Sequence, residues 1–258
     1  MVCSHEPDPN HAQPVGFLCS SSFHTSREAV STSMIEPASI KTEIGILWDL
    51  DGVLVDSAEA HYQAWAETLE KYSVRLSREN FQRTFGMNNR GIIVTLLGQS
   101  VSPELSFDIG EAKEALFRDR IRGNVRMLPG VRFWLEEFQG RRIPQVVASS
   151  APPANITTIL EELAIRSFFF DVVSGAQMPG KPDPAVFLEA ANRVKLAHSR
   201  CLVIEDSVAG VEAALAANMK CVAITNTNPR NLLVSAQLIL DSLEELSWDD
   251  LLQLFEFG

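Results

Sequence analysis

The sequence predicts an α/β protein in which a doubly wound parallel sheet carries an all-helical insertion. An unbroken apolar run at 44–48 is followed directly by charged residues, which is typical of a strand buried on both faces of a sheet. Helical periodicity without a convincing strand occupies 58–124, and strand and helix patterns alternate after Pro129-Gly130. We therefore predict a mobile tail at 1–42, a core of 43–57 and 125–258, and a helical cap at 58–124.

The composition limits the classes of partner. The chain has 258 residues and a formal net charge of -11, so a nucleic-acid backbone would be repelled overall, and we expect no nucleic-acid partner. No apolar stretch approaches the roughly 18 to 20 residues needed to span a bilayer, so we expect no membrane partner. A small anionic substrate is compatible with this negative net charge if the site carries its own cation. We expect the protein to be a monomer.

The N-terminal segment and the cysteines bear on the location of the protein. Residues 1–40 are rich in Ser, His and Pro with little hydrophobic periodicity, which is why we predict a tail there. The four cysteines show no C-x-x-C spacing, and Cys201 and Cys221 lie in apolar, strand-like runs. We therefore expect reduced cysteines and a cytoplasmic protein. The stretch SSSFHTSREAVSTS keeps an organelle transit peptide open as an alternative.

The first cap helix is predicted to start after Ser57, whose side chain can cap it. Residues at three- and four-residue spacing then define its inner face: Ala58, Tyr62, Trp65, Leu69 and Tyr72. Further cap helices are predicted at 78–85, 90–98 and 103–121. In the core, strands are predicted at 144–149, 171–175, 201–206, 221–225 and 238–240, and helices at 131–139, 153–163, 184–194, 208–217, 230–236 and 243–255.

Asp49 and Asp51 stand one residue apart at the end of the first predicted strand and precede Gly52. Two carboxylates this close repel each other, so a bound divalent cation or a shared proton is expected to relieve the repulsion. The carboxyl end of a parallel strand is also where open α/β sheets bind their ligands. A metal site is therefore our hypothesis, and a simple strand-to-loop turn is its alternative, because Asp-Gly is a common turn dipeptide.

Later strand ends also carry reactive side chains. Ser149 closes VVASS, and its hydroxyl can donate to a phosphoryl oxygen or cap the next helix. Lys181 lies in PGKPDP, whose prolines and glycine predict a rigid loop that holds the ammonium in place. Glu205 and Asp206 follow CLVI, and Asp206 or Ser207 can cap the helix behind them. At one sheet edge these positions would supply a nucleophile, a proton-transfer group, metal ligands, a cation and a hydroxyl donor.

These residues resemble the four motifs of the haloacid dehalogenase superfamily, in particular its phosphatase and β-phosphoglucomutase-like branch. The motifs are DLDGV at 49–53, Ser149 in VVASS, Lys181 in GKPDP and Glu205-Asp206 in VIEDS, and the resemblance covers about residues 44–245. It implies a Rossmann-like core with a helical cap of the C1 type inserted just after the first strand.

The resemblance also implies a reaction. Asp49 would attack phosphorus and become an aspartyl phosphate, while Asp51 would protonate the leaving oxygen and then activate water. Mg²⁺ would be held by the Asp49 carboxylate, the Asp51 backbone carbonyl and Asp206, with Glu205 in support. The phosphoryl group would be bound by Ser149, Ser150 and Lys181. We expect Mg²⁺-dependent hydrolysis of a small phosphorylated metabolite, such as a sugar phosphate.

Substrate specificity is expected to lie in the cap. The candidates are side chains of the first cap helix and of the loop FGMNNR: His61, Trp65, Asn88, Asn89 and Arg90. The alternative is that the aromatic side chains form the helix core and that the loop only turns the chain.

A sugar phosphomutase is the runner-up function, because DSAEAHYQAW is similar to the corresponding helix of the mutases. Against it, Ala151 and Pro152 stand where we expect the mutases to carry a serine and a lysine, and Phe85 replaces an expected lysine. A mutase must hold phosphate at both ends of its substrate, so these departures favour a hydrolase. The remaining alternatives are a non-catalytic binding protein on the same scaffold and a D-x-D nucleotide-sugar transferase.

Overall fold

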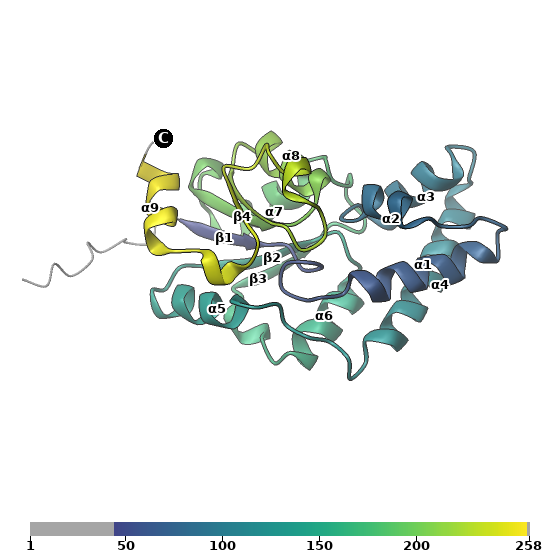
Figure 1. Ribbon diagram of the computed structural model, residues 1–258, viewed down its shortest axis with the longest axis horizontal. Helices are drawn as coiled ribbons and strands as arrows, with labels where there is room; N and C mark the ends of the chain where they lie inside the picture. Colours follow the sequence, from purple (N-terminus) through teal and green to yellow (C-terminus); the bar gives the residue numbers. More distant parts are fainter. Residues whose placement is uncertain (1–43, 257–258) are drawn as a thin grey trace, which may run out of the picture. The chain divides into compact units, whose positions relative to one another are not determined.

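Six short apolar strands form one parallel sheet in the computed structural model of the protein, which describes residues 44–256 (Figure 1). The predicted tail at 1–42 lies outside the described residues. The order of the strands is β3-β2-β1-β4-β5-β6, so the chain builds outward from β1 in both directions. The predicted α/β class with a parallel sheet is confirmed. The strands are β1 (Gly45–Trp48), β2 (Gln145–Ser149), β3 (Asp171–Ser174), β4 (Cys201–Glu205), β5 (Lys220–Ile224) and β6 (Leu238–Leu240).

The register of the sheet brings three strand ends together. Trp48, the last residue of β1, is paired with Val147 of β2 on one side and with Ile204 of β4 on the other. Because all the strands are parallel, the residues that follow these pairs emerge at the same edge. The direction of chain winding reverses beside β1, which is where doubly wound sheets hold their ligands.

Helices cover both faces of the sheet. One face packs against α5 (Val131–Gly140), α6 (Pro153–Glu162) and α9 (Trp248–Glu256), and the other against α7 (Ala185–Val194) and α8 (Val208–Ala216). Trp48 is fully buried on the first face, and its indole Nε1 donates to Gln145 Oε1 at 3.0 Å. Burial of both faces explains why the strands read as continuous apolar runs and not as alternating ones.

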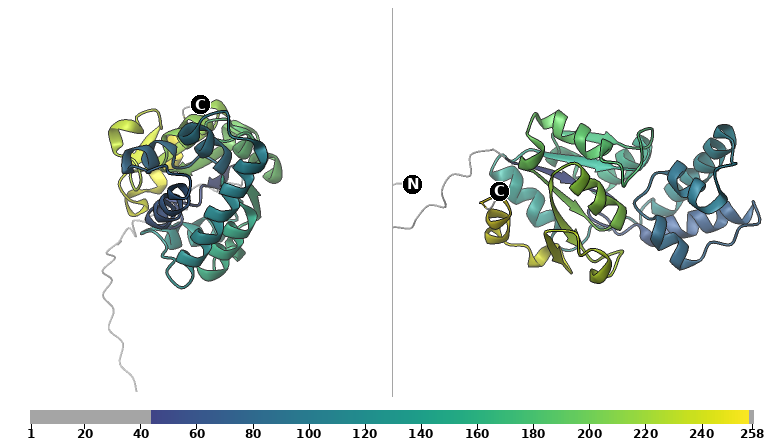
Figure 2. Two further views of the ribbon diagram at one scale, coloured as in Figure 1. Left: turned by 90° about the vertical axis from the view of Figure 1, so that its right-hand side faces the viewer. Right: turned by 90° about the horizontal axis from the view of Figure 1, so that it is seen from above.

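Residues 58–124 contain four helices and no strand: α1 (Ala58–Glu70), α2 (Arg78–Thr84), α3 (Asn89–Leu97) and α4 (Pro103–Ile121). Figure 2 shows these helices as a group beside the sheet. They share a separate apolar core that includes Trp65, Leu69 and Phe81. The loop between α2 and α3 contacts the carboxyl edge of the sheet, because Ser150 Oγ donates to the Gly86 carbonyl at 2.7 Å. The cap boundaries at 58 and 124 stay a prediction from the sequence.

Three local predictions were wrong. A helix was predicted at 230–236, but only Arg230–Leu232 forms a turn of 3-10 helix, since Leu232 and Val234 are exposed and offer no buried stripe. The helix predicted at 243–255 is divided: Leu243–Glu245 is a 3-10 turn, and α9 starts after Ser247, whose hydroxyl accepts from the Asp250 backbone N–H at 3.1 Å.

The predicted cap of α1 was also wrong. Ser57 occupies the N-cap position, but its hydroxyl donates to Asp51 Oδ1 at 2.6 Å and makes no side-chain hydrogen bond to the helix. The prediction for Ser207 is confirmed, because its hydroxyl accepts from the Gly210 N–H at 3.0 Å and caps α8. None of the helices within 44–256 combines the length and the apolar character that a bilayer crossing requires.

Candidate active site

The ammonium of Lys181 lies between two carboxylates at the carboxyl edge of the sheet. Its Nζ donates to Asp49 Oδ1 at 2.6 Å and to Glu205 Oε1 at 2.5 Å. Asp49 follows β1 and Glu205 ends β4, so the pairing of these two strands places both carboxylates side by side. Lys181 reaches them from the loop before α7, and its side chain is fully buried. Three predicted site residues, 132 and 24 positions apart along the chain, therefore form one ionic cluster.

Burial and charge shift the proton affinities of this cluster. Burial raises the pKa of Asp49 to about 7, although the charge of Lys181 opposes the rise and that of Glu205 adds to it. Burial alone would lower the pKa of Lys181, but the charges of Asp49 and Glu205 outweigh it and raise the pKa above its ordinary value. Lys181 is therefore a permanent cation beside a carboxylate that is close to its midpoint at neutral pH.

Asp206 is the carboxylate that these contacts leave unpaired. Both of its oxygens are buried, and neither has a hydrogen-bond partner among residues 44–256. Burial raises its pKa well above the ordinary value, and the charges of Glu205 and Asp49 raise it further. One oxygen each from Asp49, Glu205 and Asp206 lie within 4.8 Å of one another. A buried anion without a partner is costly unless a cation binds it, and carboxylate oxygens suit Mg²⁺, so these residues fit a magnesium ion.

Glu205 differs from Asp206 because both of its oxygens already have partners. Oε1 accepts from Lys181, and Oε2 accepts from the backbone N–H groups of Asp206 and Ser207, each at 2.7 Å. Glu205 thus positions the ammonium and the turn into α8. Gly52 lies against Asp206: a Cβ at this glycine, whose φ is +87°, would lie 1.9 Å from Asp206 Oδ2. A side chain there would displace the unpaired carboxylate.

Asp51 lies at the mouth of this cluster and is held by two hydrogen bonds to one oxygen. Ser57 Oγ donates to Oδ1 at 2.6 Å, and His61 Nε2 lies 3.0 Å from the same atom. Burial acts to raise the pKa of Asp51, but the interactions with His61 and Ser57 outweigh it and lower the pKa. The carboxylate form is therefore favoured, and Oδ2 is left for proton transfer.

The two serines after β2 have different partners. Ser149 Oγ accepts from the Ala151 N–H at 3.0 Å, which leaves its hydroxyl proton to donate to a ligand. Ser150 Oγ donates to the Gly86 carbonyl at 2.7 Å, so its proton is used by the cap. Both side chains line the pocket, but only the hydroxyl proton of Ser149 is left without an acceptor among residues 44–256.

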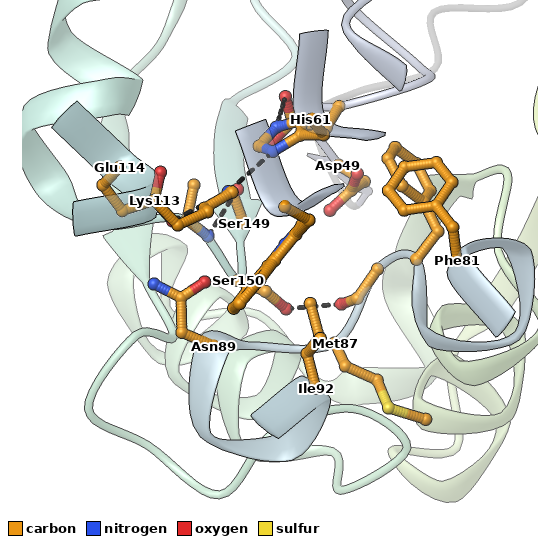
Figure 3. Close-up of a pocket in the computed structure, with 15 residues that line it drawn as sticks. Asp49, His61, Phe81, Met87, Asn89, Ile92, Lys113, Glu114, Ser149 and Ser150 are labelled. Atoms are coloured by element: carbon orange, nitrogen blue, oxygen red, sulfur yellow. Dashed lines mark hydrogen bonds and ion pairs between the residues drawn. The ribbon is translucent and has the colours of Figure 1, made fainter. Parts of the chain in front are cut away.

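A pocket joins this edge of the sheet to helices α1–α4 (Figure 3). Its empty space, about 470 Å³, includes open solvent, so the pocket is a partly open cleft between the sheet edge and the cap helices. Of the cap residues proposed from the sequence, three line it: His61, Trp65 and Asn89. Trp65 lines the pocket and also belongs to the apolar core of the cap helices, so the two alternatives proposed for it from the sequence are compatible.

Asn88 and Arg90, the other two cap candidates, are not among the residues that line the pocket. Asn88 caps α3 by accepting from the Gly91 N–H at 3.0 Å, and its amide donates to the Met178 carbonyl at 3.0 Å. Its side chain therefore joins the cap to the loop that leads to Lys181. Arg90 is exposed on the start of α3. Neither geometry supports a contact with substrate.

A buried network that the sequence analysis missed extends from His61. Lys113 Nζ lies 2.8 Å from His61 Nδ1 and 2.9 Å from Glu114 Oε1, and Glu114 Oε2 accepts from Asn155 Nδ2 of α6 at 2.5 Å. An ammonium can only donate, so His61 Nδ1 accepts and Nε2–H donates to Asp51. The spacing contained a signal, because Lys113 stands midway between Ile109 and Phe117, which are both fully buried on the same face of α4.

Comparison with known proteins agrees with this geometry. A model described as haloacid dehalogenase-like hydrolase matches residues 46–224. The chain is 30% identical over 215 residues to the chloroplastic 5-amino-6-(5-phospho-D-ribitylamino)uracil phosphatase of Arabidopsis thaliana, covering 82% of this chain and 57% of that protein. It is 29% identical over 180 residues to the phosphorylated carbohydrates phosphatase of Thermotoga maritima, covering 68% and 82% of the two chains.

A solved structure supports the same assignment. β-Phosphoglucomutase from Clostridium difficile superposes with a TM-score of 0.75 at 25% identity, covering 83% of this chain and 97% of that one. The chain spans little more than half the length of its Arabidopsis relative, 57%, so the similarity concerns this part of that protein. From the family match over 46–224 and the shared fold, the chain belongs to the haloacid dehalogenase-like hydrolase family.

Proposed function

We propose that the protein is a magnesium-dependent phosphohydrolase that acts on a small phosphorylated metabolite, such as a sugar phosphate, through an aspartyl phosphate on Asp49. The observation that carries this proposal is the pairing of Asp49 with Lys181 beside Asp206, whose two buried oxygens have no partner in the described part of the chain. The Arabidopsis and Thermotoga relatives are named as phosphatases of a phosphoribityl compound and of phosphorylated carbohydrates, which supports this class of substrate.

In the first step, Asp49 forms a bond to phosphorus while the bond from phosphorus to the leaving oxygen breaks. Lys181 holds Asp49 by Oδ1, which leaves Oδ2 for the attack. The Lys181 ammonium and the Ser149 hydroxyl neutralise charge on the phosphoryl oxygens, which is the main requirement of phosphoryl transfer. Asp51 gives a proton to the leaving oxygen, and the negative charge of a bound phosphate raises its proton affinity for this role.

In the second step, a water molecule attacks the aspartyl phosphate and free phosphate leaves. Asp51, now a carboxylate, accepts the proton of that water, and its lowered pKa keeps it in the ionised form that can accept a proton. Mg²⁺, held by Asp49 and Asp206, would supply charge neutralisation on the phosphoryl group. Glu205 keeps the ammonium of Lys181 in place through both steps.

The test is a phosphate-release screen over phosphorylated sugars, polyols and nucleotides, with and without Mg²⁺. We expect release that requires Mg²⁺ and is abolished in Asp49→Asn, which keeps the shape of the side chain and removes the nucleophile. Asp183→Asn is the matched control, because Asp183 is exposed in the same loop as Lys181. Turnover by Asp49→Asn at the wild-type rate, or no gain in mass by one phosphoryl group in acid-quenched wild-type protein, would refute the covalent route.

A sugar phosphomutase is the second candidate, because of the similarity to β-phosphoglucomutase. Phe85 and Ala151 line the pocket without charge, so they offer nothing to hold a second phosphate, and this favours hydrolysis. The same screen separates the two functions: a mutase converts a hexose 1-phosphate to an isomeric phosphate, whereas a hydrolase releases free phosphate. A monomeric state and a cytoplasmic location stay predictions.

A further inference from the structure

The charges around the pocket differ between its two ends. The end at the sheet carries Asp49 and Asp51, with Lys181 buried behind Asp49. At the cap end, Lys113 is the only cation among the lining residues that the structure describes. A ligand with two anionic groups would need a second unpaired cation at the cap end, so the state of Lys113 decides which ligands fit.

The positive charge of Lys113 is already neutralised. Its Nζ lies 2.9 Å from Glu114 Oε1 and 2.8 Å from His61 Nδ1, and its side chain is only 2% exposed. Glu114 is equally buried and also lines the pocket, so a second anionic group beside Lys113 would also lie near a carboxylate. Arg90, which follows the lining residue Asn89 in the sequence, is exposed and does not line the pocket.

The rest of the cap end is apolar. The wall consists of aromatic and aliphatic side chains: Trp65, Phe81, Phe85, Met87 and Ile92. Ser150 uses its hydroxyl proton on the Gly86 carbonyl, so Asn89 supplies the one uncharged amide of the cap lining within 44–256. Polar or charged groups of a ligand would lose hydration against this wall without gaining partners, which makes their burial unfavourable.

We propose that the substrate carries a single phosphate and no second anionic group, and that its leaving group is neutral with an apolar face turned toward Phe81, Phe85 and Met87. This rests on the proposed function, because it assumes that the phosphate lies beside Asp49. It excludes bisphosphates and phosphorylated carboxylic acids as good substrates. It also distinguishes this pocket from that of any enzyme that holds phosphate at both ends of its substrate.

The test uses matched pairs of substrates that differ in one charge. Benzyl phosphate and 4-carboxybenzyl phosphate have the same leaving oxygen, and 4-carbamoylbenzyl phosphate has the size of the second without its charge. We expect the carboxylate to lower kcat/KM by at least about tenfold relative to benzyl phosphate, mainly through KM, and the carbamoyl group to lower it less. Fructose 1-phosphate and fructose 1,6-bisphosphate form a second pair with the same expected order.

Variants then test the cause. Asn89→Arg places a cation on the pocket lining and should raise the ratio of kcat/KM for the carboxybenzyl to the benzyl ester by about tenfold. Arg90→Asn is the matched control: it changes the charge of the neighbouring exposed position and should leave the ratio unchanged. Glu114→Gln, which is isosteric and releases the Lys113 ammonium, should raise the ratio as well and serves if Asn89→Arg does not fold.

The outcomes separate the two proposals. A wild-type kcat/KM for the carboxybenzyl ester or the bisphosphate equal to or above that of its partner would overturn the single-anion inference while leaving the phosphohydrolase intact. A ratio that stays at the wild-type value in both Asn89→Arg and Glu114→Gln would overturn it too. No phosphate release from any monoester would instead refute the proposed function.

Discussion

Replacing Asp206 with asparagine should stabilise the metal-free protein while it abolishes magnesium binding. Without a metal ion, the site holds three buried carboxylates, whose ligand oxygens lie within 4.8 Å of one another, against the single ammonium of Lys181. Two unit charges at 4.8 Å repel by about 3.5 kcal/mol at an effective dielectric constant of roughly 20. Lys181 and partial protonation of Asp206 reduce this repulsion, so we expect a gain of about 1 to 3 kcal/mol at pH 8.

Glu205→Gln is the matched control and should change stability in the opposite direction. Glu205 is the neighbouring carboxylate, but its oxygens accept from Lys181 and from the N–H groups of Asp206 and Ser207. An amide would turn a donor toward one of these donors and leave the ammonium with one partner fewer. Breaking a buried ion pair in this way costs about 3 to 5 kcal/mol.

The assay is urea unfolding in EDTA, followed by thermal unfolding with and without Mg²⁺. In EDTA at pH 8, Asp206→Asn should unfold at higher urea than wild type and Glu205→Gln at lower urea. The gain in Asp206→Asn should shrink toward pH 5, because the raised pKa of Asp206 lets the wild-type group take up a proton. Mg²⁺ should raise the Tm of wild type and not that of Asp206→Asn. An Asp206→Asn protein that is less stable than wild type in EDTA, or that still responds to Mg²⁺, would refute the reasoning.

Three further predictions follow from the same contacts. The pKa of Asp49 is about 7 in the folded metal-free protein and 3.8 in the unfolded chain, so between these values only the folded state keeps the proton. In EDTA, the stability of wild type relative to Asp49→Asn should therefore fall as the pH rises from 4 to 7, and a constant difference in urea midpoint would contradict this. Gly52→Ala puts a Cβ 1.9 Å from an Asp206 oxygen and should weaken Mg²⁺ binding about tenfold in activity titrations. Gly98→Ala is the control: its φ is also positive, at +90°, but the space around it is open, so it should cost only about 1 to 2 kcal/mol of stability. Asn88→Ser keeps an N-cap for α3 but loses the amide that donates to the Met178 carbonyl, so kcat/KM should fall about tenfold with little change in Tm. An unchanged kcat/KM would show that this contact does not position the cap.

The parallel sheet and the reactive residues at its carboxyl edge could be predicted because both depend on short, contiguous stretches of sequence. Apolar runs of four or five residues identify the buried strands, and Asp49, Ser149 and Glu205 stand at the ends of three of them. Parallel strands share one carboxyl edge whatever their exact register, so the meeting of these side chains follows from fold class alone. The signal for Lys181 was weaker: its rigid loop suggested a fixed cation, but a lysine in a turn is more often a surface residue, and the resemblance supplied its role.

Other features depend on which partner is nearer in space. Ser57 could cap α1 or bind Asp51, and the proximity of the carboxylate decided for the second. Asn88 carries polar groups that suit a substrate, yet the packing of the cap loop directs its amide to the Met178 carbonyl. Lys113 follows the inner face of α4, and only the arrangement of α1, α4 and α6 brings it to His61 and Glu114.

The sequence by itself determined the order of the strands along the chain, the reactive groups at three strand ends and the family, because these depend on local periodicity and on residue type. The tertiary structure decided that both Asp206 oxygens stay unpaired among residues 44–256, that the Lys113 ammonium is neutralised by Glu114, and which cap residues line the pocket. The physical reason is that charge pairing and burial are sums over neighbours far apart along the chain, and a one-dimensional pattern does not contain those distances.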